Sequence, residues 1–161
     1  MVEAWLATLE ATALARALRA SVWVYPLVNA GHILGVGLLV GAIVPLDLRL
    51  LGAWRAVPLG PLWQVLTRCA AFGLMLAVGF GALLFITRAT EYAASGLFVT
   101  KMAVVAAATA NALALRVAGL DELWLEGGTQ GKLSARVRLA AGISLAGWMT
   151  VLILGRLVGY S

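Results

Sequence analysis

The chain has 161 residues, of which 63% are hydrophobic and 12% charged, and its mean hydropathy is +0.99. A water-soluble domain cannot bury that much apolar surface in one core, so the composition predicts an integral membrane protein whose main partner is the lipid bilayer. The formal net charge of +5 comes without a basic patch interleaved with aromatic residues, so no nucleic-acid partner is expected, and the single cysteine, Cys69, excludes an intrachain disulfide.

The N-terminal stretch, residues 1–20, is rich in Ala and Leu, which favour a helix. Charged residues interrupt it too often for a membrane span: Glu3, Glu10, Arg16 and Arg19. The basic residues follow the apolar part, which is the reverse of a secretory signal peptide. We therefore expect an interfacial helix over residues 1–20.

Four charge-poor segments follow, and each reaches the length of about 20 residues that crosses a bilayer. They cover residues 22–46, 69–87, 96–115 and 139–160. Between them we expect a short connection from Gly52 to Trp63, a tight turn around Thr90 to Ser95, and a polar loop through Asp121, Glu122, Glu126, Gly127 and Gly128. The sequence thus predicts an all-α fold: one transmembrane domain over residues 1–161, built as a four-helix bundle with an N-terminal interfacial helix.

Basic residues predict the orientation of the bundle. The first and third connections lie on one side and carry most of them: Arg49, Arg55, Arg68, Arg116, Lys132, Arg136 and Arg138. Loops that retain Lys and Arg usually face the cytoplasm, so both termini are expected on the other side, the periplasmic side in a bacterium.

His32 is the only histidine, and it lies in a stretch without Asp, Glu, Lys or Arg from Ala20 to Leu46. A polar side chain at this depth needs a partner and is a candidate for a functional site. Asn29 lies on the same helical face, and Gly31 and Gly35 remove bulk beside the ring. Three interpretations stay open: a hydrogen-bonded structural histidine, a ligand of haem iron or another metal, and a quinone, lipid or proton-transfer role.

Three cations near the outer ends of the spans extend this site. Arg88, Lys101 and Arg156 are expected at one level, and Tyr92 and Tyr160 each follow an arginine by four residues. These cations either snorkel to headgroups or bind an anionic ligand, such as a carboxylate or phosphate, with its apolar part in the bundle. The candidate pocket is lined by Tyr25, Asn29, His32, Arg88, Tyr92, Lys101, Arg156 and Tyr160.

A haem b site would need a second axial ligand, because membrane b-type cytochromes usually hold iron between two histidines. Here that ligand would be Met75, Met102, Met149, the His32 of a second copy, or a residue of a partner subunit, or else the iron stays five-coordinate. Copper is disfavoured because Cys69 and His32 lie toward opposite ends of their spans.

Other polar and small residues have structural explanations. Asp47 is expected to pair with Arg49 or Arg68 at the end of the first span, and Asn111 to hydrogen-bond between helices. Pairs of glycines four residues apart predict close helix contacts: Gly31 and Gly35, Gly37 and Gly41, and Gly155 and Gly159.

Several motifs carry a resemblance to known proteins: Val22-Trp23-Val24-Tyr25-Pro26, then His32, Gly35 and Gly41, then Leu46-Asp47-Leu48-Arg49-Leu50-Leu51-Gly52, and further on Gly81-Ala82-Leu83-Leu84-Phe85, Tyr92, Phe98, Lys101, Asn111-Ala112-Leu113, Ser144, Trp148, Gly155-Arg156 and Tyr160. Over essentially its whole length the chain resembles a family of small bacterial four-span membrane proteins of unknown function. That resemblance implies an inner-membrane location and no assigned reaction. A weaker resemblance, through His32 and Gly35, is to CopD-like copper-resistance proteins and cytochrome b561-like proteins, whose additional histidines this chain lacks.

The residues contain no Ser/His/Asp or Cys/His set, paired carboxylates or phosphate-binding loop, so no enzyme is expected. The leading hypothesis is a small accessory or ligand-binding subunit with a pocket around His32 that holds a lipid-like or cofactor headgroup. The alternatives are a haem-b-binding electron carrier that uses His32, and a purely structural subunit. Further partners would be a second copy of the chain or other membrane subunits.

Overall fold

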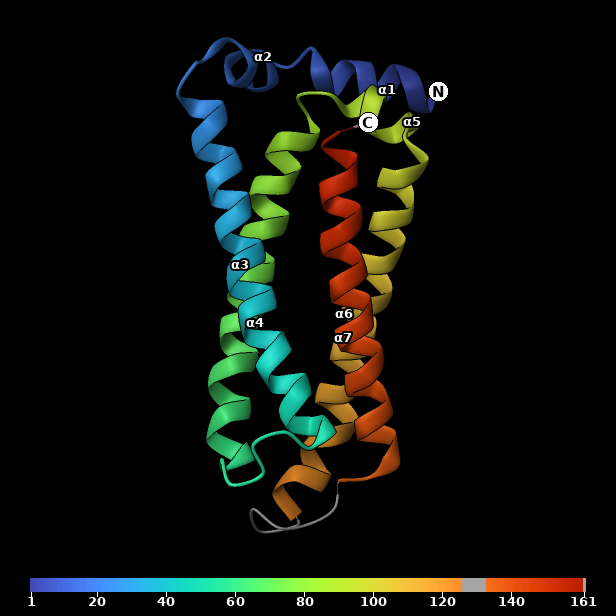
Figure 1. Ribbon diagram of the computed structural model, residues 1–161. Helices are drawn as coiled ribbons and strands as arrows, with labels where there is room; N and C mark the ends of the chain where they lie inside the picture. The colour runs from blue at the N-terminus through green and yellow to red at the C-terminus, as the bar shows by residue number, and fades with distance from the viewer. Residues whose placement is uncertain (126–132, 161) are drawn as a thin grey trace.

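The computed structural model describes residues 1–125 and 133–160, with side chains described for residues 1–117 and 133–160. Within these ranges every regular element is an α-helix, which confirms the all-α fold (Figure 1). The helices are α1 (Val2–Glu10), α2 (Ala13–Ala20), α3 (Val24–Leu51), α4 (Leu59–Phe85), α5 (Ala89–Ala94), α6 (Gly96–Leu125) and α7 (Ala135–Val158).

The four long helices, α3, α4, α6 and α7, are each long and apolar enough to cross a membrane. At the end with the α3–α4 and α6–α7 connections, all four helices extend beyond the expected charge-poor segments. At the opposite end α3 begins at Val24, α4 ends at Phe85 and α7 ends at Val158, each two residues inside the expected bounds. α4 begins at Leu59 and contains Trp63, which we had placed in a connection. α6 reaches Leu125 and takes in Asp121 and Glu122, which we had placed in a loop. The rest of that expected loop, Glu126, Gly127 and Gly128, lies outside the described residues.

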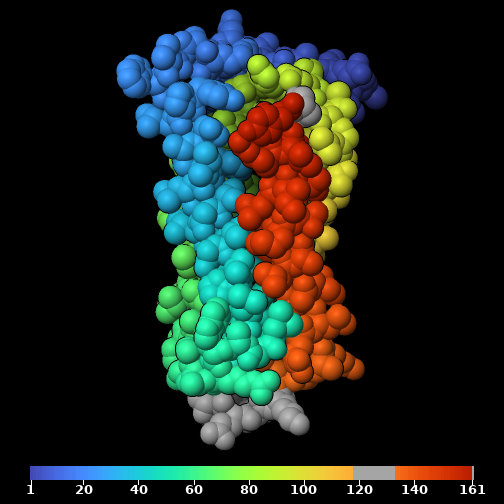
Figure 2. Space-filling view, viewed as in Figure 1, coloured from blue at the N-terminus to red at the C-terminus, as the bar shows by residue number. Residues whose placement is uncertain are grey.

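The bundle consists of two antiparallel hairpins, α3–α4 and α6–α7. They are joined by α3 against α7, which lie side by side in Figure 2, whereas α4 and α6 contact each other only sparsely. The largest buried side chains are Leu50 and Trp148, and both buried apolar clusters lie in the half of the bundle that ends in the connection between α3 and α4. Few side chains are buried in the half toward the termini.

Glycines bring α3 and α4 into direct backbone contact. A Cβ added at Gly35 would lie 2.9 Å from the carbonyl oxygen of Gly73, and one added at Gly73 would lie 2.5 Å from the amide of Leu39. Gly31 lies under the ring of Phe80 in the same way. The prediction of close packing is confirmed for Gly31 and Gly35.

The same prediction is wrong for the next pair. Among the described residues, no atom from outside the local helical turn lies within 4 Å of a Cβ added at Gly37 or Gly41, because both glycines face away from α4. At Gly155 the neighbouring group is the end of the Lys101 side chain, 3.8 Å from an added Cβ, and at Gly159 it is the carbonyl of Arg156 in its own helix. Only one of the three glycine pairs therefore makes a close helix contact.

The N-terminal segment forms two helices instead of the single one expected. Thr12 is extended (φ −63°, ψ 151°), and its hydroxyl accepts a hydrogen bond from the amide of Ala15, so it ends the first helix and caps the second. Together α1 and α2 lie across the end of the bundle where both termini and α5 are found (Figures 1 and 2). The expected tight turn around Thr90 to Ser95 is instead largely the short helix α5.

Buried Arg49 fixes the connection at the opposite end. Its Nε donates to the carbonyl oxygen of Val57 at 2.9 Å and its Nη2 to that of Arg55 at 3.2 Å, while Gly52 turns the chain with φ 114°. The expected pairing of Arg49 with Asp47 is therefore wrong, because backbone carbonyls take the guanidinium donors.

Candidate functional site

His32 is bound to the neighbouring helix. Its Nδ1 lies 2.7 Å from the carbonyl oxygen of Ala77 on α4. A carbonyl only accepts, so Nδ1 carries the proton and donates it, which leaves Nε2 unprotonated in the neutral ring. The ring packs against Gly81, where an added Cβ would lie 3.1 Å from Cε1. This arrangement satisfies the imidazole within the α3–α4 hairpin.

The other residues expected around His32 have partners of their own or are exposed. Asn29 is exposed and has no hydrogen bond among those found for the described side chains. Lys101 is partly buried beside the Phe98 ring, 5.9 Å from Nζ to the centroid, and near Gly155. Arg156 contacts Tyr160, as their spacing predicts, through a hydrogen bond and with its guanidinium 4.4 Å from the ring centroid. Lys101 therefore lies beside the residue that precedes Arg156, and each of these two cations contacts an aromatic ring.

Arg88 and Tyr92 are one turn apart at the start of α5, where the amide of Tyr92 donates to the carbonyl oxygen of Arg88 at 3.0 Å. α4 ends at Phe85, and Arg88 occupies the N-cap position of α5 with φ −148°, where it pairs with Glu91 at 3.3 Å. Tyr92 packs instead against two aromatic rings, with centroid distances of 6.3 Å to Phe85 and 5.3 Å to Phe98. Burial raises the pKa of the Tyr92 phenol, and the nearby Tyr25 phenol adds to this rise.

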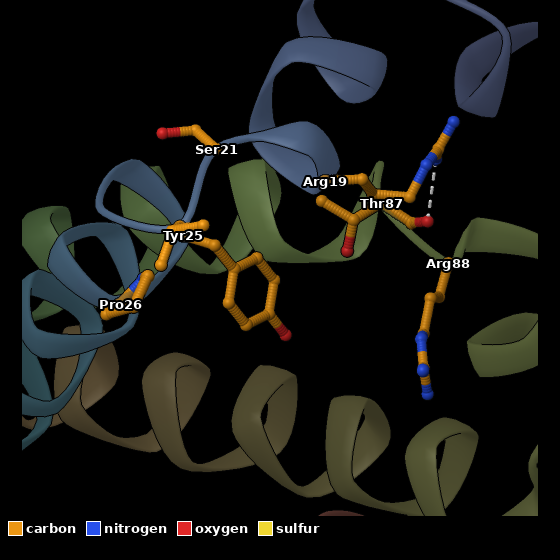
Figure 3. A pocket seen from close by; sticks show the side chains of 7 residues that line it. Arg19, Ser21, Tyr25, Pro26, Thr87 and Arg88 are labelled. Carbon is orange, nitrogen blue, oxygen red and sulfur yellow. Dashed lines mark hydrogen bonds between the residues drawn. The ribbon is translucent and has the colours of Figure 1, made fainter.

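A cavity of about 490 Å³ opens where α2 meets α3 and the α4–α5 turn. We call it the end cavity; its lining consists of Arg19, Ser21, Val22, Tyr25, Pro26, Thr87 and Arg88 (Figure 3). Figure 3 shows the Tyr25 ring and the Arg88 side chain extending toward the same side of this cavity. Of the eight residues expected to line a pocket around His32, Tyr25 and Arg88 line the end cavity.

Arg19 and Glu10 hold the N-terminal helices over the end cavity. Arg19 Nη1 donates to the Thr87 carbonyl at 2.9 Å, and its Nη2 donates to the Glu10 carbonyl at 2.7 Å. The Glu10 carboxylate accepts from the hydroxyl and the amide of Thr90, and these bonds, together with the nearby Arg19 charge, lower the pKa of Glu10. No sequence pattern predicts this network, since its partners are far apart along the chain and are mostly backbone groups.

A second cavity lies in the other half of the bundle and contains polar atoms that the sequence interpretation did not bring together. Asp47 and Trp148 both line it, and both are almost completely buried. The spacing of Ser144 and Trp148 by four residues would have placed them on one face of α7, but nothing in the sequence aligns that face with Asp47 on α3.

Comparison with known proteins adds no further assignment: no family model, curated protein or solved structure matches the chain.

Proposed function

We propose that this chain is a small, non-enzymatic, multi-pass membrane protein that binds an anionic amphiphile, with the acidic headgroup in the end cavity. One observation carries the proposal: the guanidinium of Arg88 and the hydroxyl of Tyr25 come from different helices and extend into the same cavity (Figure 3). Arginine donates two parallel hydrogen bonds to a phosphate or carboxylate, and a phenol adds a third donor.

The charges around the end cavity favour an anion. The ion pair of Arg88 with Glu91 is exposed, with 63% and 60% of the two side chains accessible, so it is weak and exchanges readily for a stronger anionic partner. Arg19 also lines the cavity, and its hydrogen bonds go to neutral carbonyls, although the nearby Glu10 carboxylate offsets part of its charge. The acyl part of the ligand would lie along the apolar outer halves of α3 and α4.

We propose further that the protein lies in the bacterial inner membrane with both termini outside. The described arginines near the α3–α4 and α6–α7 connections support this orientation: Arg49, Arg55, Arg68, Arg116, Arg136 and Arg138. In intact cells of a Cys69→Ser background, a membrane-impermeant maleimide should label Ser21→Cys and not Ala53→Cys. Labelling of Ala53→Cys alone would show the opposite orientation, with both termini in the cytoplasm.

The binding test compares two arginines at the same end of the bundle. Delipidated protein in a neutral detergent is titrated with dioctanoyl phosphatidylglycerol, dioctanoyl phosphatidylcholine and inorganic phosphate, and the complexes are counted by native mass spectrometry. Loss of one charge-assisted contact should weaken phosphatidylglycerol binding by about tenfold in Arg88→Gln. Arg16→Gln is the matched control, because Arg16 is exposed at the same end and does not line the cavity.

Equal affinity of Arg88→Gln and Arg16→Gln would refute the proposed site. Equal binding of phosphatidylcholine and phosphatidylglycerol would refute an anionic ligand. Binding of inorganic phosphate as tight as that of the lipid would assign the cavity to a soluble anion.

The geometry of His32 supports a second candidate, a haem b carrier. Histidines that bind iron through Nε2 commonly donate Nδ1–H to a carbonyl, as His32 does to Ala77. Protein expressed with haem supplementation should then show a Soret band that disappears in His32→Ala. Absence of that band in the unmodified protein rejects this candidate and leaves the end cavity untouched.

A further inference from the structure

The cavity in the half of the bundle near the α3–α4 connection has a volume of about 130 Å³. We call it the interhelical cavity, because α3, α4, α6 and α7 all contribute to it. Its walls are mainly apolar, with Leu39, Ile43, Leu46 and Leu74 among them. This lining favours an apolar ligand body.

Two polar atoms in this cavity have no hydrogen-bond partner among the described residues: Oδ2 of Asp47 and Nε1 of Trp148. The two residues are only 3% and 2% exposed, respectively. The Ser144 side chain lines the same cavity near the Asp47 carboxyl group, and Oδ2 has no hydrogen-bond partner among the described residues. Unpartnered polar groups within the bilayer are costly, because no bulk water replaces the missing bonds.

The two atoms are complementary in type. A carboxylate oxygen accepts a hydrogen bond and an indole N–H donates one, so a single hydroxyl group can serve both by donating to Asp47 and accepting from Trp148. Arg116 at the margin of the cavity is exposed and positively charged, which disfavours a cationic amine as the ligand. A neutral hydroxyl fits the charges better.

We propose that the interhelical cavity binds a neutral hydroxylated aromatic ring, of the phenol or quinol class, through Asp47 and Trp148. The cavity volume is close to the about 150 Å³ of an engineered protein cavity that binds benzene, so it suits one six-membered ring. The ring reaches it from the lipid phase between α4 and α6, the two neighbouring helices that contact each other least.

The test uses the full chain in phosphatidylcholine nanodiscs and follows 4-fluorophenol by ¹⁹F NMR, with empty nanodiscs to subtract partitioning into lipid. 4-Fluorotoluene is the matched ligand, since a methyl group replaces the hydroxyl. We expect saturable binding of 4-fluorophenol and none of 4-fluorotoluene. Loss of one hydrogen bond in Trp148→Phe should weaken the binding by about five- to tenfold.

Trp63→Phe is the matched control variant: Trp63 also lines the cavity and is buried, so the change removes the same indole atoms from the lining while leaving Nε1 of Trp148 in place. It should keep the affinity within about twofold, and Asp47→Leu should lose binding even where it melts no lower than the unmodified protein. Equal losses in Trp148→Phe and Trp63→Phe, equal binding of the two fluorinated probes, or no saturable binding at all would each overturn the proposal. The last result would assign the two polar atoms to ordered water alone.

Discussion

Glu10 and Thr90 are joined by two short hydrogen bonds across a separation of 80 residues. The carboxylate Oε1 of Glu10 accepts from the amide of Thr90 at 2.7 Å and from its hydroxyl at 2.6 Å. These bonds connect the end of α1 to the first turn of α5, and Arg19 adds a bond from α2 to the carbonyl of Thr87. The N-terminal helices are thus held on α5 and the α4–α5 turn by a few polar contacts, and their position should depend on pH.

Acid should release the N-terminal helices. The bonds from Thr90 lower the pKa of Glu10 in the folded protein below its ordinary value of 4.5. The stabilisation that ionised Glu10 provides is therefore fully present above pH 4.5 and is lost as the pH falls through the pKa of Glu10 in the folded protein. A spin label at Thr8→Cys, in a Cys69→Ser background, should become more mobile over that range. Glu10→Gln should weaken this dependence on pH.

Thr90→Val should raise the mobility of the same label at neutral pH, since it removes one of the two donors. Thr100→Val is the control, because the Thr100 hydroxyl bonds only to the carbonyl of Gly96 in its own helix. A label equally immobile in Thr90→Val and Thr100→Val would show that these hydrogen bonds do not hold α1.

Gly35→Ala should destabilise the α3–α4 hairpin. The new methyl would meet the backbone of Ala77 and Gly73, which cannot move aside as a side chain can, and overpacking of this kind costs about 1–3 kcal/mol. Gly37→Ala, two residues away, has open space around it and gains helix propensity, so it should be neutral or up to about 1 kcal/mol stabilising. Thermal unfolding in one detergent measures both, and equal melting temperatures would contradict the backbone contact.

The sequence predicted the four membrane helices well, because runs without charges leave few other structures for a chain in lipid. The sequence did not predict the partner of a polar side chain where that partner is a backbone atom. His32 could be recognised as a residue that needs a partner, yet a carbonyl such as that of Ala77 carries no sequence signal. The predicted pairing of Asp47 with Arg49 is wrong for a related reason, since the guanidinium of Arg49 donates to the carbonyl oxygens of Val57 and Arg55.

The end cavity could be predicted only in part, because the expected pocket assumed continuous helices. α4 ends at Phe85, so Arg88 begins the separate helix α5, where its side chain pairs with Glu91. Arg156 and Tyr160 lie within one turn and met as expected. Spacing along the chain is therefore a sound guide at the end of α7, whereas it does not show that α4 ends and a new helix begins before Tyr92.

His32 and Gly81 should show energetic coupling. Gly81→Ala places a methyl 3.1 Å from the imidazole, whose hydrogen bond to Ala77 resists displacement, so the variant should lower the melting temperature. In a His32→Ala background the same change should cost less, with a coupling of about 0.5–3 kcal/mol. Gly79→Ala, with open space around it, should show no coupling to His32→Ala. Strict additivity for Gly81→Ala would mean that the ring does not rest on α4.

Asn111 and Asn29 offer a matched test of polar groups in two membrane helices. Asn111 Nδ2 donates to the carbonyl oxygen of Ala140 at 2.9 Å and links α6 to α7, as expected from the sequence, whereas Asn29 is exposed on α3. Asn111→Ala should lower the free energy of unfolding by about 0.6 kcal/mol, and by no more than about 1.7 kcal/mol. Asn29→Ala should leave the free energy of unfolding unchanged, because it breaks no contact between helices. Equal destabilisation would mean that Asn29 has a partner of its own, and would return it to the list of candidate binding residues.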